Sequence, residues 1–251
     1  MTEPKDPKRE IELVPEPAGP GGKRLFVGVR VSLATANALS GAVETLARRA
    51  RDAGADIRWV APASYHVTLK YLGWTRDAAI AALCDAIATA VRGTGRLTFR
   101  TTRLGGFPSL EKASVVWAGV EGGELAALHG RIEAAVTGLG FAAETRAFHP
   151  HVTLGRLREI RAIREVVLPM SEQMFSDTRV DTVTIFESEA KSAASGYREV
   201  AKISFNPAEN PLFDASERQT QAVELSARTE SSESREAETD DGWPRGQGPS
   251  T

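Results

Sequence analysis

The sequence has very little cysteine. It holds one, Cys84, among 251 residues, so neither a disulfide framework nor a zinc site built on cysteine pairs is available. Cys84 lies in the Ala-rich stretch 78–90, which is typical of a helix, and we expect a buried helical thiol rather than a nucleophile. This composition fits a reducing compartment.

Long apolar runs are also missing. No segment approaches the roughly 18 apolar residues that cross a bilayer, and residues 1–22 are charged and rich in Pro and Gly, unlike a signal peptide. We therefore expect a soluble, cytoplasmic protein without membrane contact. Neither a GxxxxGK[ST] phosphate loop nor a GxGxxG motif after a strand is present, which disfavours the nucleoside-triphosphate and dinucleotide classes.

The net charge of −2 conceals an uneven distribution. Residues 207–251 carry ten acidic and four basic side chains, and residues 1–22 carry five and three, which leaves 18 acidic and 24 basic side chains between them. A basic body suits a polyanionic ligand such as RNA.

The two ends of the chain differ in composition from its middle. Residues 207–251 are rich in Ser, Glu, Thr, Gln and Gly and show no apolar period, so we expect a disordered acidic tail. We expect a disordered extension at 1–22 as well. One domain then remains at 23–206.

Strand and helix patterns alternate irregularly in this domain. Strands are expected at 24–31, 57–60, 65–72, 97–104, 114–120, 149–157, 178–186 and 197–205, and helices at 34–53, 77–91, 124–139 and 159–167. A Gly-Gly-Phe-Pro turn region at 105–108 is expected between two of the strands. Because this order is not a regular βα alternation, it predicts an α+β fold with mostly antiparallel strands.

One tetrapeptide occurs twice: His-Val-Thr-Leu stands at 66–69 and again at 151–154. Alternate residues of a strand share a face, so each copy places its imidazole and hydroxyl on one side and its two apolar side chains on the other. If the two strands meet at a groove, two histidines and two threonines converge there. Packing alone needs only Val and Leu and gives no account of His and Thr.

Such a set of side chains suits phosphoryl chemistry. Histidine titrates near pH 6.5, so one neutral imidazole can accept a proton from water while a protonated one donates to the departing oxygen. Threonine hydroxyls can donate to the non-bridging phosphate oxygens. This scheme makes His66 and His151 candidate catalytic residues, and Thr68 and Thr153 candidate phosphate ligands, with no metal or cofactor.

A metal site is the alternative. His149 and His151 are two residues apart and share a strand face, so with His66 they could form a three-imidazole zinc site. No Asp, Glu or Cys stands at ligand spacing, which disfavours this alternative. His129, within the predicted helix 124–139, is expected to face solvent.

In its two motifs the sequence resembles the RNA 2′,3′-cyclic phosphodiesterases, also called 2′-5′ RNA ligases, of the 2H phosphoesterase superfamily. Two His-x-Thr/Ser-hydrophobic motifs define that superfamily, and both HVTL copies match in full. The segments IRWVAPASYHVTLKYLG (57–73), LGGFPSLEKASVVWAGV (104–120) and FHPHVTLGRL (148–157) resemble the family's segments in the same order. The likeness covers 23–205, and the extensions at both ends are longer than the family needs.

The resemblance implies a bilobal, pseudo-symmetric fold, with two antiparallel sheets backed by helices around a central groove. It implies hydrolysis of a terminal 2′,3′-cyclic phosphate to a 2′-phosphomonoester, with 2′-5′ ligation as the reverse reaction. By this resemblance His66 is the proton donor and His151 the proton acceptor, while Thr68 and Thr153 bind phosphate. RNA with a cyclic phosphate end, or a small cyclic nucleotide, is the expected partner of a monomer.

Secondary contacts are also predicted. Lys70 shares the face of His66 by alternation and could steer a phosphate, or be solvated. Arg156 matches a family position but points away by strict alternation, so a phosphate contact and a structural ion pair both stay open. Tyr65, Tyr71 and Trp117 could stack on a base, with core packing the default for Trp117.

Two other functions stay open. The first is hydrolysis of a different ester, such as ADP-ribose 1″,2″-cyclic phosphate or a 2′-5′ oligonucleotide, because the loops that select a substrate cannot be placed from the sequence. The second is a module that binds RNA ends without turnover. Matched histidines in both copies disfavour it, since binding needs no acid and base.

Overall fold

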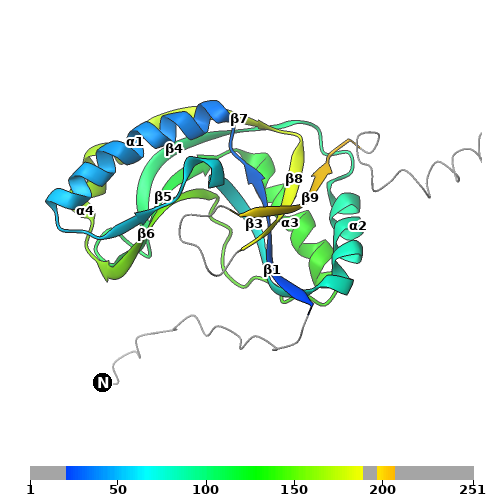
Figure 1. The fold of residues 1–251 in the computed structure, drawn as a ribbon. Helices are drawn as coiled ribbons and strands as arrows, with labels where there is room; N and C mark the ends of the chain where they lie inside the picture. The colour runs from blue at the N-terminus through cyan, green and yellow to red at the C-terminus, as the bar shows by residue number, and fades with distance from the viewer. Residues whose placement is uncertain (1–20, 189–196, 207–251) are drawn as a thin grey trace, which may run out of the picture. The chain divides into compact units, whose positions relative to one another are not determined.

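The computed structural model describes residues 21–188 and 197–206 of the chain (Figure 1). Its strands are β1 (Gly22–Arg30), β2 (Ile57–Trp59), β3 (His66–Arg76), β4 (Leu97–Phe107), β5 (Ala113–Glu121), β6 (His151–Arg161), β7 (Met174–Val180), β8 (Thr182–Glu187) and β9 (Arg198–Ser204). Its α-helices are α1 (Leu33–Asp52), α2 (Ile80–Val91), α3 (Gly123–Gly138) and α4 (Arg164–Val167), with short 3-10 turns at Pro62–Ser64, Asp77–Ala79 and Leu168–Met170. The predicted terminal extensions lie outside the described residues, apart from Gly21 and Gly22.

The strands form one sheet in the order β7-β4-β5-β6-β3-β1-β8-β9, with β2 beside β6. All of the strand pairs are antiparallel. The order has two halves of four strands, which meet where Val67 of β3 pairs with Val152 of β6. The predicted α+β class and antiparallel pairing are confirmed, and the two expected sheets are continuous at this one residue pair.

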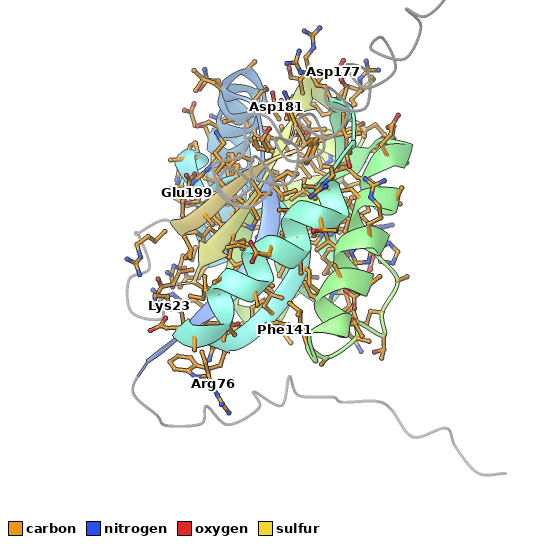
Figure 2. The ribbon with its side chains drawn as sticks, turned by 90° about the vertical axis from the view of Figure 1, so that its right-hand side faces the viewer. Lys23, Arg76, Phe141, Asp177, Asp181 and Glu199 are labelled. Carbon is orange, nitrogen blue, oxygen red and sulfur yellow. The ribbon has the colours of Figure 1, made fainter. Side chains whose placement is uncertain are left out.

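The helices cover the two halves separately. Helices α2 and α3 pack on each other beside β3 and β9, as Figure 2 shows, whereas α1 packs on β7 and α4. Helix α1 begins at Ser32, whose hydroxyl accepts a hydrogen bond from the amide of Thr35. It buries Leu39, Ala42 and Leu46 at the three- and four-residue spacing of one helix face. No helix in the described ranges is both long enough and apolar enough to span a bilayer.

Three sequence predictions need correction. The expected strand at 178–186 is two strands, because Asp181 separates β7, at the edge of one half, from β8, inside the other half. The expected helix at 159–167 is strand up to Arg161, and only α4 is helical. The turn expected at 105–108 begins later, since Gly105 to Phe107 still pair with β5.

Position 105, within strand β4, holds glycine for a steric reason. A Cβ built on it would lie 2.2 Å from Cζ2 of Trp117 on β5, so only glycine leaves room for the indole ring. Glycine therefore marks a close side-chain approach here, where the sequence suggested a turn.

The hydrophobic core lies between the sheet and the helices. Helix α3 contributes Leu125, Leu128, Ile132 and Val136, each at most 1% exposed, at the spacing of one helix face. Cys84 of α2 is buried and free, as predicted. Because α3 packs on β3, this core lies against one face of β3.

Candidate active site

His66, the first residue of β3, lies in an aromatic surround. Its ring centroid is 4.9 Å from those of Phe26 and Tyr197, and the Tyr197 ring stands edge-on to it. Its Nδ1 lies 2.7 Å from the carbonyl oxygen of Ser64. A carbonyl only accepts hydrogen bonds, so Nδ1 carries the proton of the neutral ring and Nε2 bears the lone pair. The Thr68 hydroxyl, 3.2 Å away, donates to that Nε2.

His151, the first residue of β6, has the same local arrangement. Its Nδ1 donates to the carbonyl oxygen of His149 at 2.7 Å, again two residues earlier in the chain. Its ring stands edge-on to Phe107, with 4.9 Å between centroids. Both histidines of the repeat therefore present an unprotonated Nε2 when neutral, and backbone carbonyls fix both ring orientations.

The pairing of Val67 with Val152 brings the two motifs together. In an antiparallel pair, the residues that flank such a pair also lie opposite one another, so His66 stands across from Thr153, and Thr68 across from His151. Both valines are fully buried. Their strand neighbours therefore face the other side, where the two imidazoles and two hydroxyls converge.

Both imidazoles are disfavoured in the charged form. Burial lowers the pKa of His66 to about 4. The hydrogen bond to the Ser64 carbonyl raises this pKa, and the positive charges of Arg30, His151 and Arg156 lower it. Burial also lowers the pKa of His151, with Arg156 and His149 adding to the effect. Near neutral pH, both rings of the free protein are neutral.

Each motif has a β-bulge at its leucine. In β3 the register passes from Thr68 to Lys70 and leaves Leu69 unpaired with β1, and in β6 it passes from Thr153 to Gly155 and leaves Leu154 unpaired with β5. A bulge shifts the alternation by one residue. The residues after it therefore face the opposite side from the one that strict alternation predicts.

The bulge overturns the alternation arguments for Lys70 and Arg156. Lys70 points into the core and is 4% exposed, so it does not share the face of His66. Arg156 is exposed on the face of His151, where its charge acts on the imidazoles of both motifs. The lysine is thus removed from the candidate phosphate contacts, while the arginine stays among them.

Lys70 instead anchors the loop that leads to His151. Its Nζ donates to Glu133 Oε1 at 2.8 Å and to the carbonyl oxygen of Ala142 at 2.6 Å. Glu133 Oε1 also accepts from the amide of Glu144 at 2.7 Å. This partly buried network of hydrogen bonds joins β3, α3 and the loop 141–150.

The three aromatic residues predicted to stack on a base differ in their exposure. Tyr65 is 2% exposed and cannot stack on a ligand, whereas Tyr71 is 52% exposed. Trp117 packs over Gly105 and against Phe107, but it is only half-buried, so the core position expected for it is wrong. Of the three residues predicted to stack on a base, Tyr71 has the most exposed side chain.

His129 does not face solvent, contrary to the prediction. It is half-buried, its Nδ1 donates to the carbonyl oxygen of Leu69 at 2.7 Å, and its ring stacks on Phe148. A sequence signal existed for this position. His129 stands four residues after Leu125 and three before Ile132, which places it beside the apolar stripe of α3.

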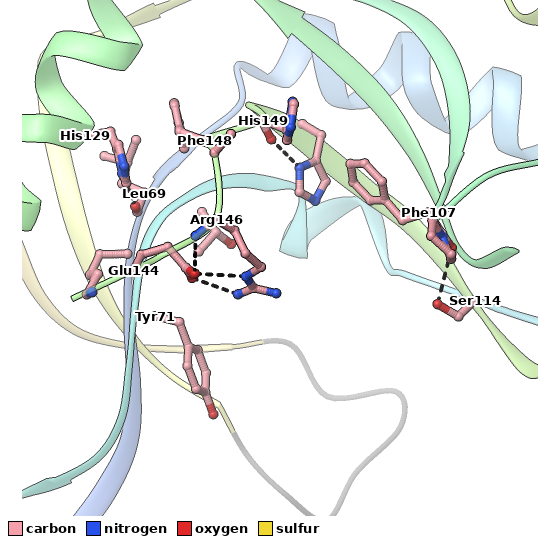
Figure 3. A pocket seen from close by; sticks show the side chains of 14 residues that line it. Leu69, Tyr71, Phe107, Ser114, His129, Glu144, Arg146, Phe148 and His149 are labelled. Carbon is pink, nitrogen blue, oxygen red and sulfur yellow. Dashed lines mark hydrogen bonds and ion pairs between the residues drawn. The ribbon is translucent and has the colours of Figure 1, made fainter. Parts of the chain in front are cut away.

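A pocket of about 610 Å³ opens beside the two motifs (Figure 3). Its lining residues are Thr68, Leu69, Lys70, Tyr71, Phe107, Pro108, Ser114, His129, Glu144, Arg146, Ala147, Phe148, His149 and His151. It thus extends from a threonine and a histidine of the two motifs along β3 to the loop 141–150. Its volume is within the range of small-molecule sites.

The geometry does not favour the three-histidine metal alternative. Within the described ranges, no group of three or more His, Cys, Asp or Glu side chains is placed to hold a metal ion. His149 is exposed and contacts His151 through its carbonyl oxygen rather than its ring.

Comparisons with known proteins agree with this geometry. The model of the 2′-5′ RNA ligase superfamily matches residues 37–191. An RNA 2′,3′-cyclic phosphodiesterase of Aeropyrum pernix is 31% identical over 134 residues, which cover 53% of this chain and 74% of that protein. A protein of the same name from Methanothermobacter thermautotrophicus is 26% identical over 154 residues, which cover 60% and 83%.

Solved structures share the fold. A Thermus thermophilus protein has a TM-score of 0.61 at 23% identity, covering 72% of this chain and 97% of that one. E. coli LigT in complex with 3′-AMP has a TM-score of 0.57 at 21% identity, covering 73% and 98%.

Proposed function

Because the chain belongs to the 2′-5′ RNA ligase superfamily, we propose that it hydrolyses the terminal 2′,3′-cyclic phosphate of an RNA to a 2′-phosphomonoester. The observation that carries this proposal is the convergence of two His-x-Thr motifs on one face of the sheet, across the pairing of Val67 with Val152. Curated relatives named RNA 2′,3′-cyclic phosphodiesterase support it.

The proposed reaction needs one base and one acid. Nε2 of His151 removes a proton from the attacking water, whose oxygen forms the new bond to phosphorus. The bond from phosphorus to O3′ breaks, and Nε2–H of His66 protonates O3′. The family resemblance assigns these roles, and the different surroundings of the two rings make the site asymmetric: Phe26 and Tyr197 pack on His66, and Phe107 packs on His151.

His66 must gain a proton before it can donate one. Its pKa of about 4 describes the free protein. A bound phosphodiester adds a negative charge beside the ring, and a neighbouring anion favours the imidazolium form. We infer that substrate binding raises the pKa of His66, so that the acid is formed only in the complex.

Three side chains are proposed to hold the phosphate. The hydroxyls of Thr68 and Thr153 donate to its non-bridging oxygens. In the free protein the Thr68 hydroxyl donates to His66 Nε2, and it turns to the phosphate when the substrate binds. The guanidinium of Arg156 adds a positive charge on the same face and stabilises the charge that develops during attack. Its position explains why it lowers the pKa of both histidines.

We propose that the protein acts as a cytoplasmic monomer without a cofactor and that the same groups can also catalyse 2′-5′ ligation. Buried, unpaired Cys84 suits a reducing compartment. In ligation the 5′-hydroxyl of a second RNA takes the place of water: His151 removes its proton, its oxygen bonds to phosphorus, the bond from phosphorus to O3′ breaks, and His66 protonates O3′.

The test is hydrolysis of nucleoside 2′,3′-cyclic phosphates in EDTA, with the product isomer identified by phosphorus NMR. We expect the 2′-phosphate. Turnover that requires added zinc would support a metal site instead, and absence of turnover under all conditions would support a binding module or a different ester.

A further inference from the structure

A second, smaller cavity lies on the other side of His66, where β1, β8 and β9 run beside β3. Its volume is about 190 Å³. That volume is below the roughly 300 Å³ at which small-molecule sites begin, and it equals the space of roughly six water molecules. The charged and buried polar side chains that line it are Arg30, Arg179, Asp181, Thr184, Glu199 and Lys202. Its size suits one phosphate group rather than a nucleoside.

Strand pairing places this cavity on the same face of the sheet as His66. Arg30 pairs with His66, and Gly28, two residues earlier in β1, pairs with Thr184 of β8. Thr184 in turn pairs with Lys202 of β9. Paired residues share a face, and so do alternate residues of one strand, so all of these positions face the groove. Thr184 is two strands away from His66, which is roughly 10 Å across the sheet.

Arg30 links the cavity to His66. Its Nη1 donates to the carbonyl oxygen of Ala63 at 2.6 Å, and its guanidinium lies over the Phe186 ring, 5.0 Å from the centroid. The Phe186 ring also packs on His66, with 5.6 Å between centroids. Because Arg30 lines the cavity as well, the cavity begins directly beside the ring that is proposed to protonate O3′.

The cavity has a surplus of positive charge. Its two carboxylates already have cationic partners, since Glu199 Oε1 accepts from Arg30 Nε at 2.6 Å and Asp181 lies 3.6 Å from Arg96. Lys202 forms neither a hydrogen bond nor an ion pair with any residue that the structure describes. Its charge is therefore available to an anion in the cavity.

Two more donors line the cavity without a partner of their own. Arg179 forms no hydrogen bond within the described part of the chain, and Asp177, whose pKa Arg100 and Arg179 both lower, is bound by Arg100. Thr184 is 3% exposed, yet its hydroxyl has no hydrogen-bond partner among the described residues. Since a buried hydroxyl is rarely left unpaired, a ligand with acceptor oxygens would complete this site.

The proposed reaction directs the RNA chain toward this cavity. In an in-line displacement the attacking and leaving oxygens lie on opposite sides of phosphorus. His151 activates the water, so O3′ and the ribose to which it belongs lie on the side of His66. The next phosphate of the chain is attached to O5′ of that ribose, and the cavity extends the groove on the same side.

We propose that this cavity binds the phosphate on the 5′ side of the ribose that carries the cyclic phosphate, an inference that rests on the proposed function. Lys202 and Arg179 neutralise the charge of this phosphate, and the Thr184 hydroxyl donates to one of its oxygens. The site makes the protein selective for the end of an RNA chain over an isolated nucleoside cyclic phosphate.

The selectivity is measured with substrates that differ by one phosphate. A nucleoside 2′,3′-cyclic phosphate lacks the 5′ phosphate, whereas its 5′-phosphorylated form carries it. We expect kcat/KM to be about tenfold higher for the 5′-phosphorylated form, because hydrogen bonds to a charged group are gained. This ratio should fall as the salt concentration rises, since counterions compete for the phosphate. Equal kcat/KM values for the two substrates overturn the proposal.

The contribution of the cavity to this ratio is tested by Lys202→Met and Thr184→Val. We expect Lys202→Met to remove most of the tenfold ratio and Thr184→Val to lower it about threefold, because the second variant loses only a hydroxyl. Lys112→Met is the matched control, since Lys112 is an exposed lysine outside the cavity, and it should keep the ratio. Thermal unfolding verifies that each variant folds. A wild-type ratio in Lys202→Met, or an equal loss in Lys112→Met, overturns the site.

Added inorganic phosphate distinguishes the RNA backbone from a free ion as the ligand. If the cavity holds a free ion, inorganic phosphate changes the turnover of the nucleoside cyclic phosphate in the wild type but not in Lys202→Met. That result overturns the assignment to RNA. We expect inorganic phosphate to act equally on both proteins with this substrate.

Calorimetric binding of adenosine 2′-phosphate and adenosine 2′,5′-bisphosphate separates this inference from the proposed reaction. Tighter binding of the bisphosphate by the wild type, lost in Lys202→Met, supports the cavity as a phosphate site even if no cyclic phosphate is hydrolysed. Hydrolysis of cyclic phosphates together with equal affinities for the two adenosine phosphates overturns the site and leaves the reaction standing.

Discussion

Val67 and Val152 pair directly across the junction of β3 and β6, both fully buried, and this one pair joins the two halves of the sheet. The pair sets the relative position of the two motifs, because the histidine and the threonine of each motif stand on either side of its valine. Apolar packing on one face thereby positions the proposed catalytic groups on the other.

Removal of either motif histidine should slow turnover strongly. We expect His66→Ala and His151→Ala each to lower kcat by at least about 100-fold, the usual contribution of an acid or base in the transition state. The measurement is steady-state hydrolysis of a nucleoside 2′,3′-cyclic phosphate. Circular dichroism and thermal unfolding show whether each variant folds, and near-wild-type kcat in a folded variant would refute the two-histidine mechanism.

Acid should destabilise the protein through His66. Its folded pKa of about 4 lies below its ordinary value of 6.5, so the unfolded chain binds the proton first as pH falls. Stability from this group is fully present above pH 6.5 and is lost as pH falls toward 4, by up to about 3 kcal/mol. Urea unfolding at pH 7 and pH 4.5 measures the loss. His66→Gln should show a smaller difference between the two pH values, and an identical difference would rule out this origin.

Arg156 should affect both substrate binding and the pH profile. We expect Arg156→Ala to lower kcat/KM by about 10- to 100-fold, because a charge that stabilises the phosphate is lost. It should also raise the pKa of both histidines, since a positive neighbour is removed. The measurement is kcat/KM between pH 4 and 9. The acidic limb of this profile should move to higher pH.

Arg156→Lys serves as the control for charge. It should retain the acidic limb of the wild-type profile while recovering part of the rate, because it keeps the charge and loses the planar fork of donors. If Arg156→Ala changes unfolding but neither the rate nor the profile, the arginine belongs to a structural ion pair.

Lys70 should matter for stability through a buried ion pair. Lys70→Met leaves Glu133 as an unpaired charge that is mostly buried, so we expect a loss of about 3 kcal/mol or more in the free energy of unfolding. Lys70→Met combined with Glu133→Leu should be less destabilised than Lys70→Met alone. Urea unfolding measures both, with exposed Lys112→Met as the matched control. A loss in Lys70→Met no larger than in Lys112→Met would show that the pair is unimportant.

The local sequence pattern was sufficient to predict much of the structure of this protein. The repeat of His-Val-Thr-Leu identified the four side chains that meet at the groove, because a strand of alternating polar and apolar residues has only one way to face a core. Apolar periodicity likewise located α1, α2 and α3 to within a few residues.

Pairing with neighbouring strands decided the rest. The bulges at Leu69 and Leu154 depend on the registers of β1 and β5, so alternation along one strand could not show that Lys70 turns inward and Arg156 outward. The change from β7 to β8 at Asp181 is likewise invisible in a continuous strand pattern. His129 reached the pocket only because α3 packs beside β3, which brings the carbonyl of Leu69 to its ring. Sequence therefore determined which residues are proposed to carry the chemistry, and tertiary contacts decided which other side chains surround them, because only those contacts set strand register and helix placement.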